Sequence, residues 1–211
     1  MVRWGFRMFE SDLDLDLAAE FDKALGKEEA DQVPLFKLTD KKPDPELAAE
    51  VREKLNQGIG VRLIDHYRQA ELGAFKTLAR YQQVLLAAML MRAGARIPDA
   101  DLQYVRGLVT NVPCRKAFDI HELGFCAAGK AQFLAALDGY AEGVPRDFRE
   151  ASCFHCGKTK ADTGSAPMMC GRCKNANYCN KDCQKAHWRS GHKLMCDMKV
   201  LSAMLKTKTK A

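Results

Sequence analysis

Seven cysteines and one histidine fall within a short stretch near the carboxyl end of this chain, and their spacing constrains the fold more than any other feature. From Cys153 to Cys196 the pattern is C-x2-C-x13-C-x2-C-x5-C-x3-C-x8-H-x3-C. Thiolate sulfur and imidazole nitrogen are preferred donors for zinc, and a structural zinc ion takes four of them. The pattern therefore predicts two four-coordinate structural zinc sites, whose eight ligands are Cys153, Cys156, Cys170, Cys173, Cys179, Cys183, His192 and Cys196.

These ligands come as four local pairs. Two pairs are C-x2-C steps, which are tight knuckles that place both sulfurs on one ion. The other two are spaced i to i+4, so that each projects from one face of a helical turn: Cys179 with Cys183, and His192 with Cys196. The spacing does not decide which two pairs share an ion, so sequential and interleaved pairing both remain open.

The start of the chain and the length of its apolar runs bear on where in the cell this protein is expected. No apolar segment of a secretory signal follows Met1, and a prominent apolar run, Val84 to Met91, is far shorter than the roughly 20 residues that cross a bilayer. We therefore expect an intracellular protein of the cytoplasm or nucleus that makes no membrane contact. Disulfides are rare in that reducing environment, which favours metal ligation for so many thiols.

Charge and cysteine content change together near residue 150. Residues 1–150 hold 21 basic and 24 acidic residues, a net charge of −3, whereas residues 151–211 hold 12 and 3, a net charge of +9. We therefore expect a helical domain of unknown function over 1–150, a finger over 151–197 and a helical, lysine-rich tail over 198–211. The apolar content of 47% is enough for one ordinary core and something smaller.

The first domain is expected to consist of short amphipathic helices that end at glycine or proline. Asp12, Asp14 and Asp16 stand at the start of the first helix, where acids act as caps and dipole partners. One short strand is possible at Ile59–Ile64. The expected fold class is mainly α, with helices at about Leu13–Leu25, Pro45 to the residue before Gly58, Leu72–Arg92, Asp99 or Asp101 to the residue before Pro113, and through Phe133–Tyr140.

The cysteine-rich segment resembles the MYND-type zinc finger at about residues 153–196. The match is carried by Tyr178-Cys179, Cys183-Gln184 and His187-Trp188, followed by His192 and Cys196, all at that family's spacing. The resemblance implies interleaved pairing, so that a small C-terminal two-zinc cross-brace finger follows the helical N-terminal domain expected from the periodicity. One zinc would be held by Cys153, Cys156, Cys179 and Cys183, and the other by Cys170, Cys173, His192 and Cys196.

Two further positions depend on the same resemblance. His187 rivals His192 as a ligand, and the resemblance assigns it a scaffold role instead. The 13-residue gap after Cys156 is longer than we expect for this family, and we interpret it as a flexible loop that leaves ligation intact.

The resemblance also implies a function for the finger. In the family, the positions of Gln184 and Trp188 help to line a surface groove that takes proline-containing peptides. A protein partner bound through the finger, in a transcriptional or chromatin assembly, is what the resemblance implies. The competing interpretation is that Trp188 only closes the small core between the zinc sites. Gly171 also stands where a hydrogen-bonding side chain would help such a groove.

Two other classes of function are weighed against protein recognition. Some proteins with this finger are lysine methyltransferases, but no stretch before Cys153 resembles that catalytic domain, so we expect no enzyme and infer no small-molecule substrate. The basic C-terminal segment could instead bind nucleic acid. Its lysines are scattered and no recognition helix is evident, so a solvated basic face is preferred.

Overall fold

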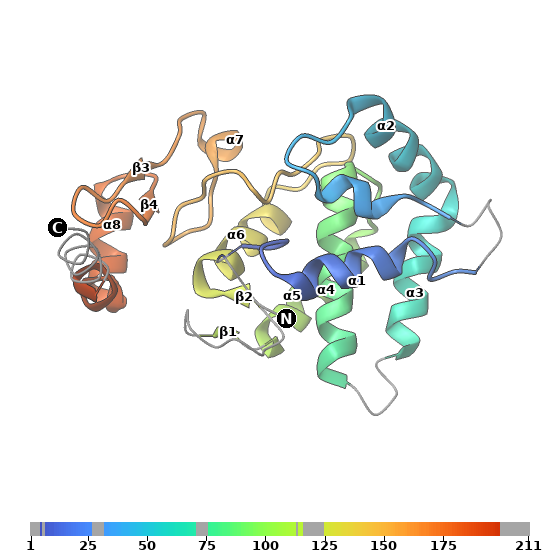
Figure 1. Ribbon diagram of the computed structural model, residues 1–211, viewed down its shortest axis with the longest axis horizontal. Coiled ribbons are helices and arrows are strands. Elements are labelled where there is room, and N and C mark those ends of the chain that lie inside the picture. The colour runs from blue at the N-terminus through green and yellow to red at the C-terminus, as the bar shows by residue number, and fades with distance from the viewer. Residues whose placement is uncertain are drawn as a thin grey trace, which may run out of the picture. The chain divides into compact units, whose positions relative to one another are not determined.

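The protein divides into two compact units, Met1–Arg149 and Glu150–Ala211. The computed structural model describes residues 5, 7–26, 32–70, 76–112, 114–115 and 125–198 (Figure 1). The prediction of a mainly α fold is confirmed. The lysine-rich end of the predicted tail, residues 199–211, lies outside the described residues.

The first unit contains helices at each of the places where the sequence predicts one, with two short parallel strands between the last two helices. Residues 72–75, at the start of the predicted third helix, lie outside the described residues. The elements are α1 (Asp12–Phe21), the 3-10 helix η2 (Leu35–Thr39), α2 (Pro45–Lys54), η3 (Leu55–Ile59), α3 (Gly60–Ala70), α4 (Lys76–Ala93), α5 (Asp99–Asn111), β1 (Cys114–Arg115), β2 (Phe125–Cys126) and α6 (Ala127–Asp138).

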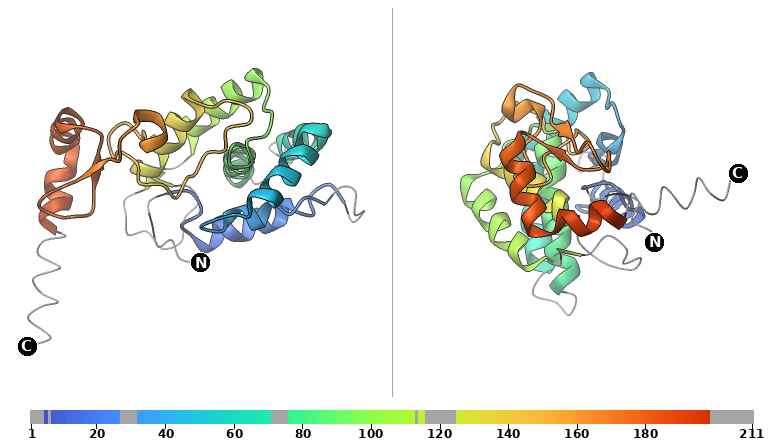
Figure 2. Two further views of the ribbon diagram at one scale, coloured as in Figure 1. Left: turned by 90° about the horizontal axis from the view of Figure 1, so that it is seen from above. Right: turned by 90° about the vertical axis from the view of Figure 1, so that its left-hand side faces the viewer.

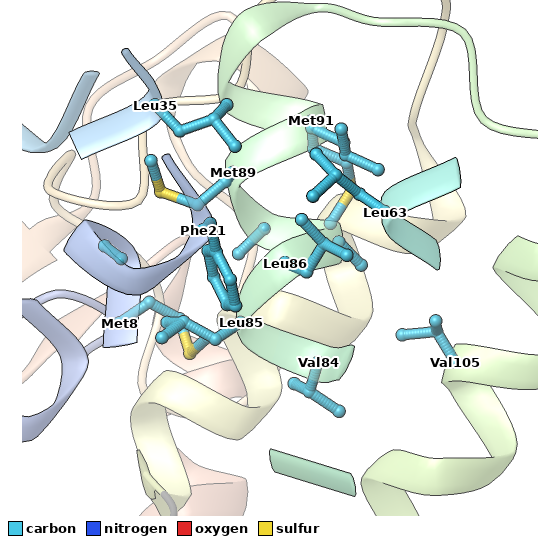
Figure 3. Close-up of a cluster of buried hydrophobic side chains, with 14 of the residues drawn as sticks. Met8, Phe21, Leu35, Leu63, Val84, Leu85, Leu86, Met89, Met91 and Val105 are labelled. Carbon is cyan, nitrogen blue, oxygen red and sulfur yellow. The ribbon is translucent and has the colours of Figure 1, made fainter. Parts of the chain in front are cut away.

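The core of this unit is built around α4. Every residue from Val84 to Met91 is at most 3% exposed, so this part of the helix is enclosed on all sides. In the left view of Figure 2 it is seen end-on among its neighbours, and Figure 3 shows Phe21, Leu63 and Val105 converging on it from α1, α3 and α5. Full burial of each large apolar side chain contributes about 1.5–3 kcal/mol, which makes this helix the main source of stability.

The strand suggested at Ile59–Ile64 is wrong, because this segment is the start of α3. Gly58 has φ 113°, a conformation open to glycine, and it breaks the chain between α2 and α3. Beyond it Ile59, Leu63 and Tyr67 are buried at a helical spacing of four residues. The glycine thus ends one helix, as the sequence predicts, but the next begins at once.

One acid of α1 behaves differently from its neighbours. Ser11 caps the helix by accepting a hydrogen bond from the Asp14 amide at 3.1 Å. The Asp14 side chain is fully buried, and its carboxylate accepts a hydrogen bond from the Tyr81 hydroxyl of α4. Asp14 therefore fixes α1 to the core helix rather than serving only as a dipole partner.

The second unit is small and holds five short elements followed by helical residues 193–198. They are α7 (Lys160–Thr163), β3 (Met168–Met169), β4 (Asn177–Tyr178), α8 (Lys181–His187) and, in continuation of α8, η4 (Trp188–His192). Strands β3 and β4 pair antiparallel. In the described part of the chain, no helix combines the length and the apolar character that crossing a bilayer would need.

The long gap between the first two cysteine pairs is not the flexible loop that the sequence suggested. It forms α7, whose capping box joins Thr159 and Asp162: the Thr159 amide donates to the Asp162 carboxylate at 2.8 Å. Gly164, at φ 75°, ends this turn. The extra residues are therefore locally organised.

Candidate metal centre

Each C-x2-C knuckle closes on the residue that follows its second cysteine. The Gly157 amide donates to the Cys153 carbonyl at 2.8 Å, and the Lys174 amide donates to the Cys170 carbonyl at 3.0 Å. Both residues are left-handed, with φ 78° at Gly157 and φ 53° at Lys174. The same tight turn therefore presents the two sulfurs of each knuckle to one point.

The two i to i+4 pairs lie on either side of a break in the C-terminal helix. Asn180 caps α8 by accepting a hydrogen bond from the Cys183 amide at 2.9 Å, which places Cys179 and Cys183 at its start. Gly191, at φ 135°, then interrupts the helix just before His192. The right view of Figure 2 shows the change of direction that follows.

The structure brings the eight predicted residues together in two groups of four. In each group the donor atoms all lie within 4.8 Å of one another. The pairing is interleaved, as the family resemblance implied, and sequential pairing is not seen. One group consists of Cys153, Cys156, Cys179 and Cys183, and the other of Cys170, Cys173, His192 and Cys196.

The distances within these groups fit a tetrahedral zinc ion. With Zn–S bonds of about 2.3 Å, neighbouring sulfurs of a tetrahedron lie about 3.8 Å apart. The Cys156 sulfur lies 3.6 Å from that of Cys179 and 3.9 Å from that of Cys183. In the second group the Cys173 sulfur lies 3.7 Å from Nε2 of His192. Donor type, number and spacing therefore all suit zinc.

The electrostatics of the thiols also call for a cation. Burial raises the pKa of Cys183 to about 12, and the charges of Cys153 and Cys156 contribute to that rise. At Cys170 burial opposes ionisation too, but hydrogen bonds from the adjoining backbone and from His192 lower its pKa to about 6. Within the second group Cys170 can thus ionise, whereas burial raises the pKa of its neighbour Cys196 to about 12. A doubly charged ion removes this conflict by compensating several thiolates at once.

His187 lies beside the second group without joining it. Its ring stacks on His192 with centroids 5.2 Å apart, and its Nδ1 lies 2.9 Å from the Tyr178 hydroxyl. Burial, followed by the charge of His192, lowers the pKa of His187 to about 4. A neutral ring in this position supports the orientation of the ligand His192, which is the scaffold role predicted for it.

Gln184 and Trp188 occupy one row of the helix that carries the ligands. The Trp188 side chain packs against the small core around Tyr178 and meets the His192 ring at 5.8 Å, edge to face. It is nevertheless only half-buried. Gln184 is also half-buried, and no hydrogen bond to its side-chain amide is found within the described ranges. Trp188 thus closes the core and still presents part of its indole to solvent.

Comparison with known proteins places the finger in a family. The sequence model of the MYND finger matches residues 153–196. Programmed cell death protein 2 of Rattus norvegicus is 55% identical over 121 residues, which cover 52% of this chain and 33% of that protein. Ubiquitin carboxyl-terminal hydrolase 19 of Arabidopsis thaliana is 38% identical over 67 residues, or 28% of this chain and 9% of that protein.

N-lysine methyltransferase SMYD2 of Homo sapiens is 35% identical over 89 residues, which cover 36% of this chain and 19% of that protein. The chain thus spans at most about a third of the length of these curated relatives. No solved structure matches it. The donor pattern, the interleaved groups and the family match agree, and residues 153–196 are a MYND finger, a zinc-binding module for interaction with other proteins.

Proposed function

We propose that this protein recognises an extended, proline-containing segment of another protein through the surface formed by Gln184 and Trp188. The observation that carries the proposal is the half-exposed indole of Trp188, next to a glutamine whose amide is available, on a helix anchored by metal ligands. An indole face suits the ring of proline, and an amide can pair with the backbone of an extended peptide.

We propose that the finger binds two zinc ions and that both are structural. Each group supplies four protein donors, which fill a tetrahedron and leave no position for a water molecule or a substrate. We accordingly propose a binding role for the finger rather than a catalytic one. The proposed setting is inside the cell, where the seven thiols stay reduced, in a transcriptional or chromatin assembly as the family resemblance implies.

The proposal is tested by measuring the affinity of the zinc-loaded, full-length chain for proline-containing peptides by fluorescence anisotropy. We expect Gln184→Ala to weaken binding several-fold, because the peptide loses a backbone hydrogen bond. Trp188→Ala should weaken it further. Since Trp188 also contacts His192, the zinc content of the Trp188→Ala variant must be measured in parallel.

The matched control is Gln57→Ala, which removes an exposed helical glutamine from the first unit. Its peptide affinity should equal that of the parent protein. Unchanged affinity in both Gln184→Ala and Trp188→Ala, with zinc retained, would show that this surface is not the binding site. Equal affinity for a peptide in which alanine replaces proline would remove the proline requirement.

A further inference from the structure

Three basic side chains form a row along the helix that carries Gln184 and Trp188. Lys181, Lys185 and Arg189 are all exposed and follow one another at intervals of four residues. Backbone dihedral angles remain helical beyond α8, through Trp188 and up to the break at Gly191. Residues at i and i+4 lie on the same helix face. These three residues are called the basic ridge.

The basic ridge lies directly beside the surface proposed for peptide binding. Gln184 follows Lys181 by three residues, and Trp188 follows Lys185 by three. Residues three apart are neighbours on a helix surface, so the two rows run side by side along the same helix. A peptide held by Gln184 and Trp188 therefore passes within reach of the ridge.

Little within the finger neutralises this ridge. Lys185 approaches the Asp182 carboxylate at 3.8 Å, but both side chains are more than two-thirds exposed, so the contact is weak. For Lys181 and Arg189, the described residues provide no ion pair. Residues 153–196 hold eight basic and two acidic residues. Even with seven thiolates and two zinc ions counted, the finger keeps a net charge of about +3.

We infer that the partner segment is acidic beside its proline, with carboxylate side chains at alternate positions that face the basic ridge. This inference rests on the proposed function and names the class of peptide that the same surface selects. Successive ridge residues are about 6 Å apart along the helix axis. Alternate residues of an extended chain are about 6.6 Å apart and point to the same side. Asp or Glu at every second position thus matches the ridge in spacing and in charge.

The test compares three peptides of equal length on the zinc-loaded, full-length chain: a proline peptide with Asp at alternate positions, the same peptide with Asn in place of Asp, and the Asp peptide with alanine in place of proline. At low ionic strength we expect the Asp peptide to bind about five- to tenfold more tightly than the Asn peptide. The difference should shrink at high salt, because exposed charges are screened.

Variants separate the ridge from general charge. Replacing Lys181, Lys185 and Arg189 with Gln should abolish the preference for Asp while leaving the affinity for the Asn peptide unchanged. The matched control replaces Lys158, Lys160 and Lys174 with Gln, which removes the same charge from other exposed positions of the finger and should keep the preference. Asp182→Asn should increase the affinity for the Asp peptide, because it removes the acid beside Lys185.

The outcomes distinguish this inference from the function on which it rests. Equal binding of the Asp and Asn peptides, or a preference that survives in the ridge variant, overturns the inference and leaves peptide recognition intact. Failure of both proline peptides to bind overturns the proposed function itself. A competition experiment uses a single-stranded oligonucleotide with the same net charge as the Asp peptide. If the oligonucleotide displaces the Asp peptide equally well from the parent protein and from Trp188→Ala, the ridge is a general anion-binding surface, which also overturns the inference.

Discussion

At the scale of single residues, the two knuckles of the finger differ at one position that governs their strain. Gly157 and Lys174 occupy the same place after the second cysteine, and both have positive φ. Glycine adopts this conformation without penalty, whereas a residue with a side chain pays about 1–2 kcal/mol. The second knuckle is therefore the more strained of the two.

We expect Gly157→Ala to destabilise the zinc-loaded finger by about 1–2 kcal/mol, since it introduces that strain with the smallest side chain at a buried position. Lys174→Gly should stabilise it by less than about 1 kcal/mol, because the relief is offset by the greater freedom of glycine in the unfolded chain. Urea denaturation at a fixed free zinc concentration measures both changes. Lys174→Ala serves as the control, because it removes the side chain but keeps the strained backbone, and it should bring no gain. A gain in Lys174→Ala equal to that in Lys174→Gly would contradict the explanation.

At the scale of elements, a glycine with strongly positive φ breaks a helix twice in the described chain. Gly58 does so between α2 and α3, and Gly191 does so between α8 and residues 193–198. A Cβ at Gly191 would meet no atom within 4 Å, so the requirement for glycine there is conformational rather than steric. The break directly precedes His192, a ligand of the second zinc site.

Gly191→Ala should accordingly weaken the second zinc site while leaving the first unaffected. The backbone strain of about 1–3 kcal/mol corresponds to at least a several-fold loss of zinc affinity at one of two sites. Competition with a chromophoric chelator resolves the two classes of site. Gly171→Ala is the matched control, because Gly171 is exposed, has no positive φ and would make no contact through a Cβ. Loss of both sites together would show that the break is not specific to His192.

Local patterns predicted the elements well where one signal dominated. The helical period and the glycine and proline stops located the helices of the first unit, and donor spacing located the seven cysteines of the two groups. The choice of His192 over His187 came from the family resemblance. The segment Ile59–Ile64 was misassigned because a short apolar run does not distinguish a strand from a buried helix. The burial of Asp14 against Tyr81 depends on a contact between two residues 67 positions apart in the sequence, which no local pattern reports.

Within the finger, the missed features had weaker signals. The capping box of α7 is written in the sequence as Thr159 followed three residues later by Asp162, and that signal could have replaced the expectation of a flexible loop. The four-residue spacing of the basic ridge was also visible, but its lysines were interpreted as scattered. Spacing alone left the pairing of the zinc ligands open, because that pairing depends on how distant knuckles meet in space.

At the scale of the whole molecule, the two units depend on different sources of stability. The first unit is organised around α4 and its buried stretch Val84–Met91, whereas the buried apolar side chains of the second are few and are mostly the ligands themselves. Removing zinc should therefore unfold residues 150–198, because the uncompensated thiolates then repel one another and little core remains. The backbone amides of α4 should stay protected.

Hydrogen exchange before and after addition of a chelator measures both effects in one experiment. Cys183→Ser offers the same comparison without a chelator, since it removes one donor from the first group. Loss of protection in α4 after zinc removal would show that the first unit needs the finger in order to fold. Protection that persists in both units would contradict the role of metal as the main support of the finger.

The interleaved donor groups have a mechanical consequence for the covalent chain. Each donor group has two members at or before Cys173 and two at or after Cys179, so the segment between these cysteines separates the two halves of both sites. A protease that cleaves the backbone anywhere in that segment would leave two fragments bridged by both zinc ions, whereas with sequential pairing no zinc ion would bridge them and they could dissociate. The cleaved protein should migrate as one particle under native conditions, and the fragments should separate only after a chelator removes the zinc ions.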